Sequence, residues 1–136
     1  MSMAPDMTVT LRLPTQTLFE AQATRLTAVA ANGAFGIWPN HIDFVTALVP
    51  SVLTLHRPDG TEEIFGIDEG LLVKKGHLVS VSVRRGVHGD DLAGLQDLVE
   101  TRFVQMDEDE RQARSALSRL EADLVRRFAE LQRPQP

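Results

Sequence analysis

The sequence predicts an α+β protein: an N-terminal antiparallel β-sandwich followed by a C-terminal antiparallel α-helical hairpin. All nine glycines lie between Gly33 and Gly94, and no proline occurs between Pro58 and Pro134. Turn-forming residues therefore punctuate the first part of the chain, whereas the last part can form uninterrupted helix. The expected segments are an N-terminal extension (1–6), the sandwich domain (7–88), the helical hairpin (89–133) and a short tail (134–136).

Apolar and polar residues alternate in several short segments of the first part. This period of two, which is typical of a strand with one buried face, occurs in the segments 8–13, 52–56 and 78–83. Pro58 and Gly60 fit a turn between two such strands, and the segment 74–77 predicts a second hairpin. Because a single sheet of this size could not bury both of its faces, we expect two packed sheets.

The last part of the sequence carries two apolar stripes with helical spacing. The first consists of Leu92, Leu95, Val99, Phe103 and Met106, and the second of Ala113, Leu117, Leu120, Leu124, Phe128 and Leu131. The acidic run 107–110 predicts a break between them and supplies carboxylates to the start of the second helix. We expect the two stripes to pack on each other, with Asp90 or Asp91 capping the first helix.

The side chains that catalysis or metal binding would need are missing or scattered. There is no cysteine, no Gly-x-Ser-x-Gly motif and no phosphate-binding loop. His41, His56, His77 and His88 lack the spacing of metal ligands, and the acidic run lacks the alternation of a calcium loop. The net charge of −5 gives no support for nucleic-acid binding. We therefore predict no enzyme activity, no cofactor and no metal site.

The segment 33–48 is rich in aromatic residues, which lie beside glycines and a proline. Phe35, Trp38 and Phe44, three of the seven aromatic residues, lie within ten positions beside Pro39. Aromatic clustering beside a turn is typical either of a corner of the core or of an anchor in an interface. Both interpretations stay open at the level of these residues.

This segment resembles the epsilon subunit of the F-type ATP synthase. The family pattern Gly-x-Phe/Leu-Gly-Ile-x-Pro-x-His, followed by Thr-x-Leu, is filled by Gly33, Phe35, Gly36, Ile37, Pro39, His41, Thr46 and Leu48. The segments 68–73 and 75–81 are similar to later family stretches, with Glu69 in place of a glycine. Ser51 also replaces a usual glycine, and the opening 9–20 is similar to the first family hairpin. The resemblance covers about residues 7–88 by motif and the rest by architecture alone.

The resemblance implies a non-catalytic subunit of the central stalk, which couples ion flow to ATP synthesis. The sandwich would bind the gamma subunit and rest on the c ring. The hairpin would fold against the sandwich or extend toward the alpha and beta subunits and restrain ATP hydrolysis. The chain would be a peripheral protein at the cytoplasmic face of the bacterial inner membrane. It would be attached only through the complex, since its apolar runs are far shorter than the roughly 20 residues of a spanning helix.

The resemblance also assigns residues to three surfaces. The gamma interface is expected at Phe35, Trp38, His41 and Phe44, the c-ring-facing turn at Asn32, Gly33 and Ala34, and the regulatory charges of the hairpin at Arg111, Arg114, Arg119, Arg126 and Arg127. Residues 111–133 carry six arginines against three acidic residues, a net of +3 in a chain of net −5. A solvated helix face with ion pairs such as Arg119–Asp123 and Arg126–Glu130 is the structural alternative for these charges.

Some positions depart from the family. Many members carry an acid where this sequence has Ala34, so contact with the c ring would rest on backbone polar groups and Asn32. Members that bind ATP use an Ile/Leu-Asp-x-x-Arg-Ala motif, but the segment 91–96 has no arginine, so ATP binding is not predicted. The N-terminal extension and these departures suggest a variant, sodium-translocating synthase, although the choice of ion lies in the c ring.

Two other classes of protein are alternatives to this interpretation. The first is a β-sandwich adaptor with a coiled-coil tail that binds an unrelated protein or a glycan. It differs in its partners, because only a stalk subunit must co-purify with gamma and the c ring. The second, a small hydrolase, is disfavoured by the missing nucleophile and base.

Overall fold

The computed structural model describes residues 4–132. Its strands are β1 (Met7–Arg12), β2 (Thr17–Ala23), β3 (Arg25–Ala30), β4 (Gly33–Ile37), β5 (Phe44–Leu48), β6 (Ser51–His56), β7 (Glu62–Ile67), β8 (Gly70–Lys75), β9 (Leu78–Val83) and β10 (Gly86–Gly89). Its helical segments are α1 (Leu92–Leu98), the π-helical η1 (Val99–Val104) and α2 (Gln105–Leu131). The predicted tail, Arg133 and the first three residues of the predicted extension lie outside the described residues.

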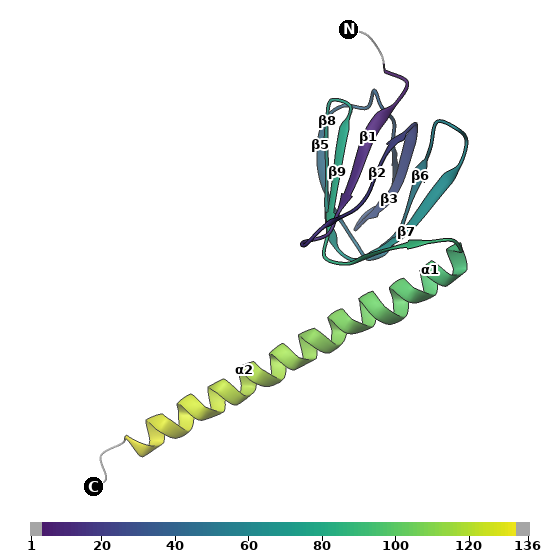
Figure 1. The fold of residues 1–136 in the computed structure, drawn as a ribbon. Helices are drawn as coiled ribbons and strands as arrows, with labels where there is room; N and C mark the ends of the chain where they lie inside the picture. Colours follow the sequence, from purple (N-terminus) through teal and green to yellow (C-terminus); the bar gives the residue numbers. More distant parts are fainter. Residues whose placement is uncertain (1–3, 133–136) are drawn as a thin grey trace. The chain divides into compact units, whose positions relative to one another are not determined.

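The strands form two five-stranded sheets, in the orders β2-β1-β9-β8-β5 and β10-β7-β6-β3-β4 (Figure 1). The predicted β-sandwich is therefore confirmed. Neighbouring strands run antiparallel, except that β1 pairs with β9 in parallel, with Val9 opposite Val79. This pair places β1 between β2 and β9, so both sides of β1 are paired.

The core fills the space between the two sheets. Alternate residues of β1, β6 and β9 are buried, as the period of two predicted, and they join one cluster with Leu26, Phe65 and Leu72. Both predicted turns are present: Gly60 (φ +89°) lies between β6 and β7, and Gly76 (φ +60°) lies between β8 and β9. In the first turn the backbone N–H and hydroxyl of Thr61 donate to the carboxylate of Asp59, which lowers the pKa of Asp59.

The three central members of the first apolar stripe pack on the sandwich rather than on a second helix, whereas Leu92 and Met106 are half exposed. Leu95, Val99 and Phe103 are buried, and α1 contacts β6, β7 and β10. Glycines provide the close approach, because a Cβ on Gly66 would lie 3.3 Å from side-chain atoms of Leu95 and Val99, and one on Gly89 would lie 2.5 Å from Leu95. The helix begins at the predicted cap, where the carboxylate of Asp91 accepts from the N–H of Gly94.

The predicted hairpin is wrong, although the predicted class, a sandwich followed by a C-terminal helical region, is confirmed. The acidic run 107–110 lies within α2 and forms no turn. The second stripe is exposed; Leu117, Leu120 and Phe128 each keep more than half of their accessible surface. Helical structure runs without a break from α1 through η1 into α2, and the acidic run contains neither glycine nor proline to end it.

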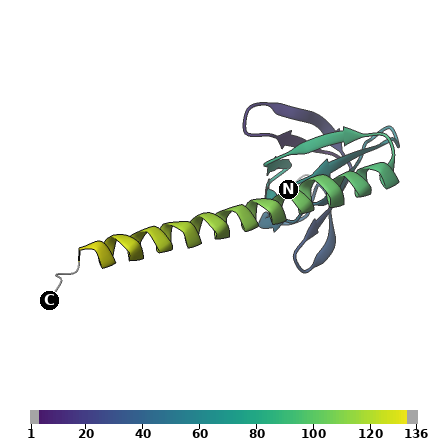
Figure 2. The same ribbon diagram turned by 90° about the horizontal axis from the view of Figure 1, so that it is seen from below.

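By its internal contacts the chain divides into two compact units, one reaching to Val104 and one starting at Gln105. The first contains the sandwich with α1 and η1, so it is larger than the predicted sandwich domain. The second contains α2, which is one regular helix in the ribbon (Figure 2). None of the residues of α2 is buried. None of the described helices is long and apolar enough to cross a membrane.

Candidate partner-binding sites

Phe35 and Phe44 form a corner of the core. Phe35 lies on β4, the edge strand of one sheet, and Phe44 on β5, the edge strand of the other. Their rings meet edge to face with centroids 5.7 Å apart, and both pack against the buried cluster. The pair therefore closes the side of the sandwich where the two sheets have their open edges. Of the two interpretations left open by the sequence, the structure supports the corner of the core for Phe35 and Phe44.

Trp38 is held on the outside of the sandwich. Its side chain covers Gly36, where a Cβ would lie 2.9 Å from the ring, and it remains 52% exposed. The guanidinium of Arg25 lies 6.0 Å from the centre of the Trp38 ring. Arg25 in turn donates to Nε2 of His56 at 2.8 Å, so the proton of neutral His56 lies on Nδ1, 3.2 Å from the carboxylate of Glu62. Trp38 is thus an exposed aromatic side chain that is supported by Gly36 on one side and by Arg25.

Gly36→Ala is expected to shift the fluorescence emission of Trp38, which is the only tryptophan, while the free energy of unfolding changes by less than about 1 kcal/mol, because the half-exposed ring can move aside. The added methyl group would collide with the ring and displace it from the strand. Ala34→Ser, at an exposed position of the same strand, is the matched control and should leave the emission unchanged. Parental emission in the alanine variant would mean that Gly36 does not support the ring.

His41 lies in the loop between β4 and β5 and is exposed. Its backbone N–H donates to the carbonyl of Trp38 at 3.0 Å, and its Nδ1 lies 2.9 Å from the carbonyl oxygen of Ile42. The ring also lies 5.5 Å from that of Phe44. The structure therefore brings the four residues expected at the gamma interface to one end of the sandwich, with Phe35 and Phe44 inside and Trp38 and His41 outside.

The residues expected to face the c ring lie at the other end of β4. Asn32, Gly33 and Ala34 are exposed and belong to the tight turn from β3 to β4, in which Ala30 pairs with Gly33. Gly33 has φ +125°, which L-amino acids with a side chain rarely adopt. The two expected contact surfaces of the sandwich are thus separated by the length of one strand.

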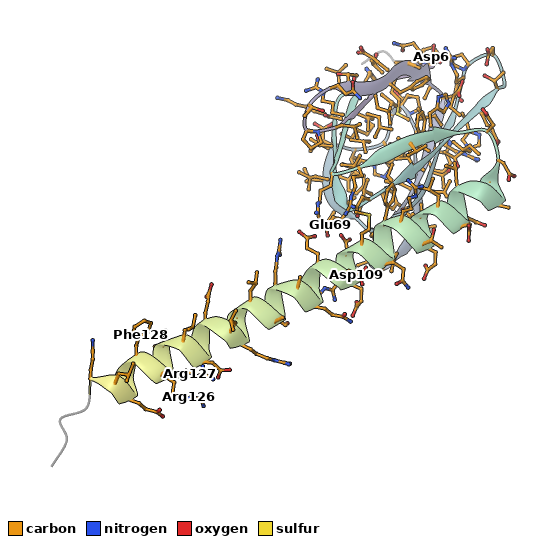
Figure 3. The ribbon with its side chains drawn as sticks, turned by 60° about the horizontal axis from the view of Figure 1, so that its bottom comes forward. Asp6, Glu69, Asp109, Arg126, Arg127 and Phe128 are labelled. Carbon is orange, nitrogen blue, oxygen red and sulfur yellow. The ribbon has the colours of Figure 1, made fainter. Side chains whose placement is uncertain are left out.

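The five arginines expected to regulate hydrolysis are exposed on α2, in a single helix rather than in a hairpin. Arg114 pairs with Glu110 at 3.2 Å, and Arg126 pairs with Asp123 rather than with the predicted Glu130. Figure 3 shows Arg126, Arg127 and Phe128 projecting from the helix. Ion pairs along the helix therefore account for part of the charge, as the structural alternative requires.

The comparisons with known proteins decide the family. The beta-sandwich domain of the ATP synthase Delta/Epsilon chain matches residues 6–89. The chain is also 37% identical over 134 residues to "ATP synthase epsilon chain 2" of Paraburkholderia xenovorans, which covers 97% of this chain and 96% of the relative. This chain belongs to the ATP synthase delta/epsilon family. A second family member, "ATP synthase epsilon chain 2" of Cereibacter sphaeroides, is 35% identical over 88% of this chain and 85% of its own.

Solved structures of ATP synthases contain the family fold. A chain of the Euglena gracilis mitochondrial enzyme, solved as the OSCP/F1/c-ring assembly, matches with a TM-score of 0.63 at 17% identity, over 74% of this chain and 66% of its own. A chain of the Tetrahymena thermophila central stalk and c ring gives 0.51 at 18% identity, over 60% and 65%. These likenesses concern the fold. The resemblance stated from the sequence is thus confirmed, and the family's epsilon chains are non-catalytic subunits of the stalk.

Some residues that shape these surfaces were missed by the sequence analysis. Arg25 orients Trp38, and the amide of Asn40 both accepts from and donates to the backbone of Ala4. Lys74 supports the carbonyl of His41 from inside the sandwich. The sequence contained a signal for Lys74, because Lys74 lies two positions after Leu72 in β8 and therefore on the same, inward face of the strand. Within residues 4–132, no three potential metal ligands come together.

Proposed function

We propose that the chain is the epsilon subunit of a bacterial F-type ATP synthase and acts as a non-catalytic part of its central stalk. One observation carries the proposal: relatives named as epsilon chains align with the sandwich and with the helical region together, over as much as 97% of this chain. An adaptor that shared only the sandwich would not be expected to match through α2. On this proposal the chain is peripheral, at the cytoplasmic face of the membrane.

The end of the sandwich that carries Trp38 and His41 is the proposed binding surface for gamma. Interface anchors are commonly aromatic, and they bind best when their orientation is fixed before the partner arrives. Trp38 meets both conditions, because it is half exposed and is held by Gly36 and Arg25. Phe35 and Phe44 support this surface from the core.

The turn at Asn32, Gly33 and Ala34 is the proposed contact with the c ring. It offers an amide side chain and exposed backbone groups but no charge, so the contact would rest on hydrogen bonds. The remaining surface, α2, is proposed to restrain ATP hydrolysis by binding the alpha and beta subunits. Its exposed arginines suit carboxylates on a partner, since a guanidinium can hold a carboxylate with two hydrogen bonds.

His41→Glu is expected to weaken binding to gamma by roughly tenfold without lowering the melting temperature. The side chain is exposed, so a negative charge there should disturb the partner rather than the core. The measurement is the dissociation constant for purified gamma, with a melting curve of each variant. Gln16→Glu, which adds the same charge in the exposed turn between β1 and β2, is the matched control.

Equal affinities of the two variants would remove His41 from the interface. The broader proposal is tested by co-expressing the chain with gamma and the c ring and purifying the complex through gamma. A stalk subunit is retained under these conditions. An adaptor for an unrelated protein or a glycan is lost during the purification, and that loss would contradict the proposal.

A further inference from the structure

Lys74 is one of two buried charged residues in the described part of the sandwich; the other is Asp68, which pairs with Arg85. Lys74 lies in β8 directly opposite Phe44 of β5 and keeps only 2% of its accessible surface. Its stem points inward on the same face of the sheet as Leu72. Its neighbour Lys75, by contrast, is exposed. A buried ammonium group is costly unless hydrogen-bond acceptors replace its water, so the acceptors of Lys74 are of interest.

These acceptors are two backbone carbonyls from different parts of the chain. Nζ donates to the carbonyl of His41 at 2.6 Å and to the carbonyl of Gly76 at 2.5 Å. The same two segments are joined a second time, because the N–H of Gly76 donates to the carboxylate of Asp43 at 2.7 Å. Lys74 thus connects the loop 38–43 with the turn between β8 and β9.

The His41 carbonyl belongs to the turn that carries the exposed rings of Trp38 and His41, so its position affects how these rings are presented. The N–H of His41 donates to the carbonyl of Trp38, so the two residues belong to one small turn. Fixing the far side of this turn from below limits the directions in which the His41 ring and the Trp38 ring can point. If the loop moved, the His41 carbonyl would no longer accept from Lys74, and the buried ammonium group would lose one of its two acceptors. The free energy lost with this hydrogen bond opposes movement of the loop.

We propose that Lys74 is a positioning residue of the partner-binding end of the sandwich: it orders the loop 38–43 from the core, and so presents Trp38 and His41 to gamma. This inference rests on the proposed function, which supplies gamma as the partner. Lys74 itself contacts no partner. Its effect on affinity comes from order that is established before binding, since a loop that is already in its bound conformation loses less entropy on binding.

The test compares Lys74→Met with Lys75→Met in the full chain. Both variants lose one positive charge, but only the first removes the ammonium from beneath the loop. We expect the amide protons of His41 and Gly76 to exchange faster in Lys74→Met, and the fluorescence emission of Trp38 to shift. The dissociation constant for purified gamma, measured at a temperature where both variants are fully folded, is expected to rise by roughly tenfold. Lys75→Met should leave all three quantities at their parental values.

A purely structural role would lower the melting temperature of Lys74→Met and leave the dissociation constant of the folded protein unchanged, and that result would overturn the proposal. If Lys74→Met does not fold, Asp43→Ala replaces it, because Asp43 is exposed and its loss breaks only the second link to Gly76. A rise of about threefold in the dissociation constant is then expected, and parental affinity would overturn the proposal. If the parent chain fails to bind gamma, the proposed function is wrong, while unchanged amide exchange would refute the ordering of the loop by Lys74.

Discussion

Phe103→Ala is expected to lower the free energy of unfolding of the first unit by about 3–5 kcal/mol. The ring is 4% exposed in η1, at the end of the stripe that packs on the sandwich, and the guanidinium of Arg85 lies 5.7 Å from its centre. Truncation to alanine removes buried apolar surface and leaves a cavity, and both effects destabilise the folded state. Urea unfolding followed by the fluorescence of Trp38 measures the change.

Leu120→Ala is the matched control from the second stripe. Leu120 is 59% exposed on α2, so its truncation should change the free energy of unfolding by less than about 0.5 kcal/mol. In the predicted hairpin, the same substitution would have removed a buried contact. A loss of several kcal/mol in Leu120→Ala would therefore mean that α2 packs on another element in solution.

Truncation of the chain after Met106 is expected to leave assembly of the complex intact and to raise its ATP hydrolysis by roughly fivefold or more. This prediction depends on the proposed function of α2. Assembly should survive because the buried core residues and the proposed gamma and c-ring surfaces all precede Gln105. The rise is expected because the proposed restraint lies in the removed helix. The measurements are the subunit content of the purified complex and its steady-state hydrolysis rate.

The arginines of α2 are expected to carry part of this restraint. Replacing Arg114, Arg119, Arg126 and Arg127 together by glutamine should reproduce part of the rise, and the restraint in the parent should weaken with salt because exposed charges are screened. Replacing Glu121, Asp123 and Glu130 by glutamine is the control and should produce no rise. Parental hydrolysis by the truncated complex at both low and moderate salt would show that α2 is structural.

Local patterns predicted the sandwich well, because a period of two and the chemistry of turns act over a few residues. Asp59 and Gly60 fix their turn wherever the strands lie, and the apolar parity of β1, β6 and β9 fixes which face is buried. The family motif drew attention to the segment 33–48. It could not divide its aromatic residues between core and surface, since that depends on how the edges of two sheets meet.

The failed hairpin has a physical reason. A stripe such as Leu95, Val99 and Phe103 shows which face of a helix is apolar, but it does not show what covers that face. The missing information was in the strands, where Gly66 and Gly89 leave a smooth surface on which a helix can lie. Lys74 was overlooked for a related reason, because a lysine in a strand is usually taken as exposed unless its parity is compared with that of its neighbours.

The parallel pairing of β1 with β9 has a consequence for how the protein is made. Thr8 pairs with Leu78, so β1 finds its second neighbour only after about 70 further residues have been synthesised. At 5–20 residues per second, one side of the β1–β2 hairpin stays without its partner strand for roughly 4–14 seconds on the ribosome. Contacts between such distant residues also slow folding. During this interval one side of β1 has no partner strand, and an unpaired strand edge is a template for pairing with another chain.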